Sequence, residues 1–110
     1  MKKDSLYLSH IYEESEFILE TIDSMTRSKF LESRIIQKAV IQSLGVIGEA
    51  AKQISPDFRE AHPYIDWKGM SGLRDRLIHG YFVINLSQVW EVISDDIPLL
   101  HDQLYKILKE

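Results

Sequence analysis

The chain has 110 residues, of which 45% are hydrophobic and 27% are charged, a composition typical of a folded globular protein. It contains no cysteine, which excludes disulfide bonds and thiolate metal sites, so we expect a cytoplasmic protein. No apolar run approaches the roughly 20 residues of a membrane-spanning helix, and the first ten residues lack the apolar stretch of a signal peptide.

The formal net charge of −4 argues against a protein that coats nucleic acid with its whole surface. One local basic site is still possible, because several cationic residues fall in the middle of the chain. They are Lys52, Arg59, Lys68, Arg74 and Arg76.

Helical periodicity fills the first half of the chain. Apolar residues recur every three or four positions over residues 5–22, and Asp4 before them is a suitable N-cap. A turn and a new cap follow, and residues 28–54 then form the longest expected helix. Gly45 and Gly48 lie inside it, where each costs about 1 kcal/mol relative to alanine, so we expect them to permit the close approach of another helix.

Two further helices are expected in the second half. Residues 55–57, Ser-Pro-Asp, end the second helix. The third covers residues 66–80, from an aspartate suited to N-capping to a glycine suited to the position after a helix end. The fourth begins near Asn85 and should be kinked or broken at Pro98. Only residues 81–84 look strand-like. The pattern predicts an all-α fold, an antiparallel bundle of four main helices.

One segment carries the candidate chemistry: Arg74-Asp75-Arg76-Leu77-Ile78-His79-Gly80-Tyr81. It resembles the R-x-x-x-x-H-x-Y signature of HepT proteins in the HEPN superfamily. The resemblance covers nearly the whole chain and implies a single HEPN/HepT-like domain over residues 1–110. Four other segments also carry it: Phe30-Leu31, Ile47-Gly48-Glu49-Ala50-Ala51, Pro63-Tyr64-Ile65-Asp66-Trp67 and Val89-Trp90.

The resemblance implies a metal-independent endoribonuclease without a cofactor, the toxin of a type VII-like toxin–antitoxin pair. The implied substrates are RNAs, including tRNA in some members. The implied partner is an MntA-like nucleotidyltransferase, which silences the toxin by adding AMP to Tyr81. Family members form homodimers with their two motifs facing each other. Two other interpretations stay open: a non-catalytic HEPN module that binds a nucleotidyltransferase, and an inactive bundle that kept the fold.

The residue types in the motif suit RNA cleavage by the RNA's own 2′-hydroxyl. That reaction needs a base, an acid and positive charge on the transition state. His79 titrates near neutral pH and can perform either proton transfer. Arg74 stays charged and can grip phosphate oxygens with its forked guanidinium.

The spacing of the two candidate catalytic residues sets a geometric problem. On a straight helix Arg74 and His79 are about 140° apart, so they do not lie side by side. Either Arg74 reaches around, the last helical turn unwinds before Gly80, or a dimer brings the groups together. We prefer the dimer, in which two histidines supply the base and the acid. Asp75, four residues before His79, would lie beside it and favour its protonated form.

Two acidic residues are candidates for supporting roles. Asp75 follows the motif arginine, where many relatives carry asparagine, and could weaken RNA binding or orient Arg74 or His79. Glu49 could pair with Arg74 or Lys52, or could simply be solvated. Of the remaining notable side chains, we expect Arg76 to be a surface charge, His10, His62 and His101 to be incidental, and Trp67 and Trp90 to serve packing.

Overall fold

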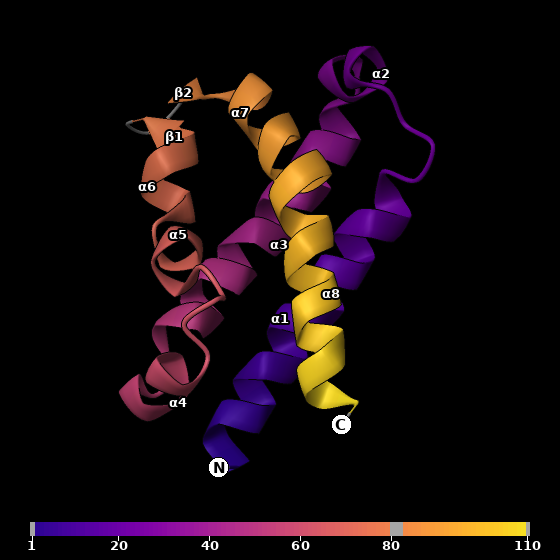
Figure 1. Cartoon of the computed structure of the whole chain (residues 1–110). Helices are drawn as coiled ribbons and strands as arrows, with labels where there is room; N and C mark the ends of the chain where they lie inside the picture. Colours follow the sequence, from indigo (N-terminus) through magenta and orange to yellow (C-terminus); the bar gives the residue numbers. More distant parts are fainter. Residues whose placement is uncertain (1, 80–82, 110) are drawn as a thin grey trace.

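The structure, a computed structural model, describes the backbone of residues 2–79 and 83–109, and the side chains of residues 3–77 and 83–109 (Figure 1). The described part is almost entirely helical, which confirms the predicted all-α class. Its elements, in chain order, are α1 (Lys2–Thr21), α2 (Arg27–Glu32), α3 (Arg34–Lys52), α4 (Pro56–Ala61), α5 (Trp67–Ser71), α6 (Leu73–Leu77), β1 (Ile78–His79), β2 (Val83–Ile84), α7 (Leu86–Glu91), the π-helix η1 (Val92–Asp96) and α8 (Ile97–Leu108).

The three longest helices form the body of the molecule. α1 packs against both α3 and α8, and α3 also contacts α5 and α6. In Figure 1, α8 passes in front of α1, while α5, α6 and β1 form a column beside them. Three of the four predicted helices are divided into shorter elements, so a simple bundle of four helices is not confirmed.

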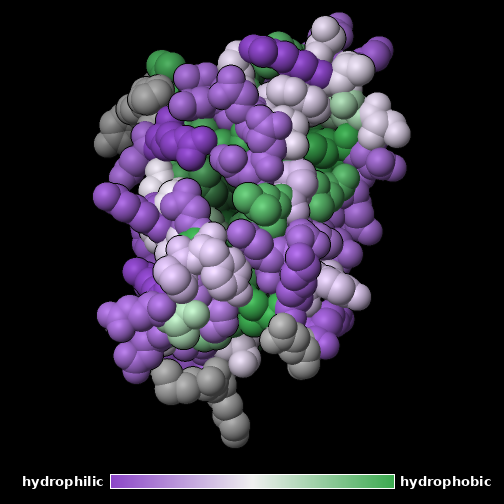
Figure 2. Space-filling model, in the orientation of Figure 1, coloured by the Kyte–Doolittle hydropathy of each residue, from purple (hydrophilic) through white to green (hydrophobic). Residues whose placement is uncertain are grey.

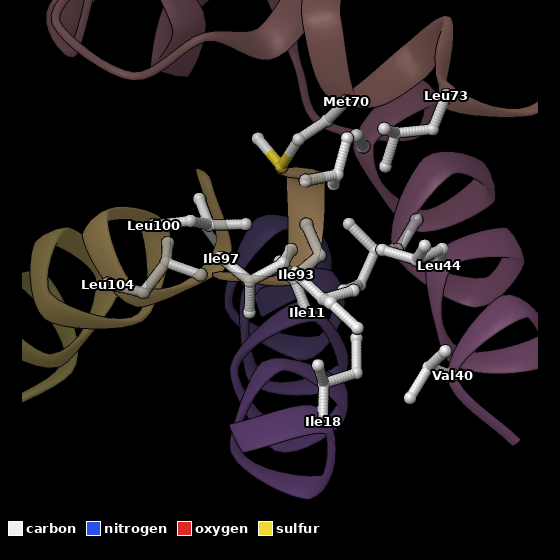
Figure 3. Close-up of a cluster of buried hydrophobic side chains, with 14 of the residues drawn as sticks. Ile11, Ile18, Val40, Leu44, Met70, Leu73, Ile93, Ile97, Leu100 and Leu104 are labelled. Carbon is white, nitrogen blue, oxygen red and sulfur yellow. The ribbon is translucent and has the colours of Figure 1, made fainter. Parts of the chain in front are cut away.

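The core lies where α1, α3, α5, α6, η1 and α8 converge (Figure 3). Ile11 and Ile18 of α1 are fully buried, and Figure 3 shows Ile11 and Ile93 near the centre of the cluster. Ser15 interrupts the apolar stripe of α1 in sequence but is itself buried. Its hydroxyl donates a 2.7 Å hydrogen bond to the carbonyl of Tyr12, which satisfies the polar group inside the core.

The predicted helix over residues 28–54 is broken at Ser33, so that prediction was wrong in its continuity. The N–H of Ser33 donates to the carbonyl of Phe30 at the end of α2. Its hydroxyl accepts from the N–H of Ile36 at the start of α3. The Gln37 side chain donates to the carbonyl of Phe30 at 2.9 Å. One residue therefore closes one helix and opens the next.

Asp4 does not cap α1, as we had expected; it lies inside the helix and is buried. Its carboxylate accepts hydrogen bonds from the N–H of Ser55 at 2.9 Å and from the Ser55 hydroxyl at 2.7 Å. The Ser55 hydroxyl also accepts from the N–H of Phe58 and so caps α4. Residues 55–57, predicted only as a helix end, therefore also start a new helix, with Pro56 in its first turn.

The two glycines of α3 have different surroundings. A Cβ atom on Gly48 would lie 3.1 Å from the carbonyl oxygen of Met70, so α5 crosses α3 closely at this point, as predicted. A Cβ atom on Gly45 would meet nothing within 4 Å among the described residues. The prediction of close helix approach is wrong for Gly45 within this chain.

The fourth predicted helix is capped by Asn85, whose side chain accepts from the N–H of Gln88 at 3.1 Å. We expected a kink or break at Pro98. Instead, the five residues of η1 form a π-helix immediately before α8, and Pro98 lies in the first turn of α8. Proline lacks an N–H and clashes with the carbonyl four residues earlier, and a wider turn relieves both problems.

None of the helices in the described ranges combines the length and apolar character needed to cross a membrane.

Candidate functional site

The backbone of the Arg–His–Tyr segment leaves the helical conformation at Leu77. β1 and β2 pair in antiparallel fashion, with Ile78 opposite Ile84 and His79 opposite Val83. The N–H of Asn85 donates to the carbonyl of Leu77 at 2.9 Å and closes the ribbon. The side chain of His79 and all of Gly80 and Tyr81 lie outside the described residues.

This ribbon bears on one of the arrangements that the sequence left open, the unwinding of the last helical turn. The predicted helix over residues 66–80 ends early, and its last turn is unwound before Gly80. Strand residues advance about 3.3 Å each, against 1.5 Å in a helix, so His79 is carried farther from Arg74 along the chain. The helical spacing from which we expected Asp75 to lie beside His79 does not hold, because His79 lies in β1 and not on a continuous helix.

Arg74 lies on α6 with an exposed side chain and lines a groove of about 620 Å³. We call this cavity the α1–α3 groove, since those two helices supply most of its wall. Among the described residues, no carboxylate forms a salt bridge with Arg74. Its guanidinium is therefore available to an anion in the groove. The polar residues of the wall include Tyr7, His10, Gln42, Glu49, Lys52 and Arg74.

Arg76 points to the opposite side of α6, as predicted. Its guanidinium lies 3.5 Å from the carboxylate of Asp96 in η1. Both residues border a second hollow, between α5, α6, η1 and α8, whose floor includes Met70 and Leu100. Hydrophobic atoms are visible in a hollow framed by hydrophilic ones in Figure 2. The two arginines of the motif thus serve different surfaces, and only Arg74 faces the α1–α3 groove.

The two candidate supporting carboxylates differ in position. Glu49 lines the same groove as Arg74, but its carboxylate lies 3.5 Å from the ammonium of Lys52. Both of these side chains are exposed, so the pair contributes little to stability. Asp75 is exposed on α6 and is not part of the groove wall. The structure brings Arg74 and Glu49 together on one wall and leaves Asp75 outside it.

Two residues of the groove were not singled out from the sequence as functional. Tyr7 and His10 lie one helical turn apart on α1, with ring centroids 6.4 Å apart. His10 was expected to be incidental, yet it is exposed in the groove that holds Arg74. Their i, i+3 spacing on a helix facing α3 was the available signal. It has meaning only once the packing of α1 against α3 is known.

The other histidines and both tryptophans have structural surroundings, as predicted. Nδ1 of His62 lies 3.1 Å from the carbonyl of Phe58, and the two rings are stacked. His101 stacks on Tyr12 with centroids 4.7 Å apart. Both tryptophans also have partners within the fold. The indole N–H of Trp67 donates a hydrogen bond to the carbonyl of His62, and the ring of Trp90 packs against that of Phe30.

A helical core, an arginine in an open groove and a histidine five residues further along the chain are the features expected of a HEPN-type protein. The family model described as "Ribonuclease HepT-like" matches residues 11–107, and the chain belongs to this HepT-like family.

Relatives from three organisms are in line with this family membership. A protein of Caldanaerobacter subterraneus named "Putative RNase" is 39% identical over 110 residues, 100% of this chain and 98% of the relative. Another "Putative RNase", from Methanocaldococcus jannaschii, is 41% identical over 99% of this chain and 91% of its own length. A "Probable ribonuclease HepT" of Thermococcus cleftensis is 40% identical over 94% of each chain. No solved structure gave a significant match.

Proposed function

We propose that the chain is a metal-independent endoribonuclease in which Arg74 and His79 form the active site. The observation that carries the proposal is the exposed guanidinium of Arg74, which has no salt bridge among the described residues, at the wall of an open groove in a chain of net charge −4. A fork of charged N–H donors in such a position suits a phosphodiester. Membership of the HepT-like family supports the same reaction class.

The proposed reaction is an internal transesterification. The 2′-oxygen of the RNA attacks the adjacent phosphorus while a base removes its proton, and the bond from phosphorus to the 5′-oxygen breaks as an acid protonates that oxygen. The products are a 2′,3′-cyclic phosphate and a 5′-hydroxyl. Arg74 stabilises the charge on the phosphorane-like transition state, and His79 performs proton transfer.

We further propose that two copies of the chain form one cleft. The unwinding at β1 carries His79 away from Arg74 in a single chain, so a second copy is the simplest source of a nearby imidazole. The described surface next to the motif offers apolar contacts for it, since Val83 is 61% exposed and Ile84 is 39% exposed. In this arrangement the two His79 imidazoles supply the base and the acid.

The proposed biological role is that of a toxin silenced by a nucleotidyltransferase that adds AMP to Tyr81. Tyr81 lies outside the described residues, but its place in the chain bears on the proposal. It is two residues from His79 and two from Val83, whose backbones pair in the ribbon. A phosphate attached there would compete with RNA for the cations of the site.

Cleavage of a labelled RNA oligonucleotide and of tRNA, with and without EDTA, tests the ribonuclease. Arg74→Ala and His79→Ala should each lower the rate by at least about 100-fold. Arg74→Lys should recover little, because lysine lacks the fork. Arg76→Ala, two residues away and paired with Asp96, is the matched control and should retain most of the activity. Equal behaviour of wild type and His79→Ala would favour a non-catalytic module that binds a nucleotidyltransferase.

Co-expression with a nucleotidyltransferase encoded by a neighbouring gene tests whether AMP is added to Tyr81. Intact-mass measurement should show AMP-sized increments on the wild type and none on Tyr81→Phe. An unmodified wild-type chain, or equal modification of the variant, would contradict the role of Tyr81.

A further inference from the structure

The α1–α3 groove extends well beyond Arg74. It is also lined by Lys52 and Gly45 of α3 and by Tyr7 and His10 of α1. Its volume of about 620 Å³ falls within the range of small-molecule pockets, about 300–1,000 Å³. One guanidinium on one phosphate leaves most of this space unused, so the groove can accept more of a ligand than the reacting group.

The cations of the groove indicate an anionic ligand. Lys52 and Arg74 both lie on its wall, on two different helices, in an otherwise acidic protein. The only described ion pair on this wall is the exposed one between Lys52 and Glu49, which a phosphate could displace at small cost. Two cations on one wall can contact successive phosphates of one strand.

The end of the groove on α1 is suited to a planar group. The ring centroids of Tyr7 and His10 lie 6.4 Å apart there, with the rings tilted by 58°, and His10 is exposed. Gly45 also lines the groove, and a Cβ atom there would meet nothing within 4 Å among the described residues. The buried hydroxyl oxygen of Ser71 has no hydrogen-bond partner in the described part and lies on the same wall. Aromatic faces with nearby polar groups are how proteins hold unstacked bases.

The charge pattern also sets a limit to the site. Beyond Gln42 the seam between α1 and α3 continues as a second hollow lined by Glu14, Phe17 and Ala39. The Glu14 carboxylate repels phosphate and, unlike that of Glu49, forms no salt bridge among the described residues, so the RNA-compatible stretch ends near Gln42.

We propose that the α1–α3 groove binds the nucleotides of single-stranded RNA next to the scissile phosphate. Lys52 holds a neighbouring phosphate, and a base lies against Tyr7 and His10. This proposal rests on the proposed ribonuclease function and adds the binding path and the single-stranded form of the substrate. A duplex does not fit the scheme, because its bases are already stacked and paired.

The binding experiment uses the full chain with His79→Ala, so that RNA stays intact, and a fluorescent single-stranded oligoribonucleotide followed by anisotropy. Lys52→Ala should raise Kd by about tenfold and lower the salt slope by about one. His10→Ala and Tyr7→Leu should each raise Kd about tenfold. The matched controls, Lys38→Ala on the exposed face of α3 and Tyr105→Ala on α8, lie outside the groove and should bind like the parent. Circular dichroism confirms that each variant is folded.

The outcomes separate this proposal from the one on which it rests. If wild type cleaves RNA but the groove variants bind and cleave like the controls, the groove proposal is wrong and the ribonuclease stands. If the oligonucleotide binds through Lys52 and His10 but is never cleaved, the groove proposal stands and the ribonuclease is wrong. Groove variants that change only the oligomeric state would assign the groove to a subunit interface and overturn the RNA site. Equally tight binding of a duplex would overturn the single-strand claim.

Discussion

Gly48 and Gly45 show how one residue type has two uses within a single helix. Replacement by alanine should favour the helix by about 0.5–1 kcal/mol at either position. At Gly48 the new methyl group meets the carbonyl of Met70 at 3.1 Å, whereas at Gly45 it meets nothing described. We expect Gly48→Ala to be less stable than Gly45→Ala by about 1–3 kcal/mol in urea unfolding. Equal stabilities would mean that α5 shifts without penalty.

The bond between Asp4 and Ser55 gives a second prediction at the residue scale. The hydroxyl and N–H of Ser55 bind the carboxylate and hold the pKa of Asp4 below its ordinary value of 3.8. Asp4→Ala should therefore lower stability by about 1–3 kcal/mol near pH 7. The folded state binds this proton more weakly than the unfolded state, so the contribution is complete above the unfolded pKa and is lost as pH falls through the folded one.

Urea unfolding of wild type and Asp4→Ala at neutral and acidic pH measures this contribution. The difference in unfolding free energy should shrink as the pH falls below about 3.8. Asp95→Ala, at an exposed position of η1, is the control and should be near neutral. A difference that grew toward acidic pH would have the wrong sign for this bond.

At the scale of elements, Ser33 is the joint between α2 and α3. Ser33→Ala should destabilise the chain by about 0.5–2 kcal/mol through loss of the N-cap of α3. The backbone bond from Ser33 to Phe30 is unaffected by this change, so α2 should persist. Hydrogen exchange should show faster exchange at the first turn of α3, with Ser33→Thr close to wild type. Unchanged protection there would argue against the cap.

Local signals predicted some elements well and others poorly. The caps at Asp66 and Asn85 could be predicted from short sequence patterns, and the structure confirms both of them. The break at Ser33 and the strand at His79 are not visible in apolar periodicity, because tertiary contacts and the pairing with residues 83–84 decide them. The helical class followed from the sequence, and the division of the helices did not.

The residues of the candidate site could likewise be predicted only in part from the sequence. Arg74 could be identified from one contiguous motif. Tyr7, His10 and Lys52 could not be grouped with it, because the groove exists only after α1, α3 and α6 have packed together. Sequence spacing along a single helix holds no information on that assembly.

At the scale of the whole molecule, the proposed dimer can be tested by mixing. Wild type and His79→Ala are co-refolded in equal amounts, and RNA cleavage is compared with unmixed wild type. A cleft that needs both histidines should retain about one quarter of the activity, whereas independent sites should retain about one half. Light scattering verifies that the mixture is dimeric. A value near one half, or a monomer with full activity, would exclude the shared cleft.

The π-helix η1 has a consequence for how the chain tolerates changes in length. A π turn accommodates one residue more than an α turn, so η1 is equivalent to a single-residue insertion in a regular helix. The apolar residues of α7 and α8 stay in phase because the wide turn absorbs that insertion. Removing one exposed residue from η1 would preserve the phase, but removing one inside α8 would rotate everything after it by about 100°. Shortening of the chain is thus far safer at the exposed positions of η1, Asp95 and Asp96, than a turn later.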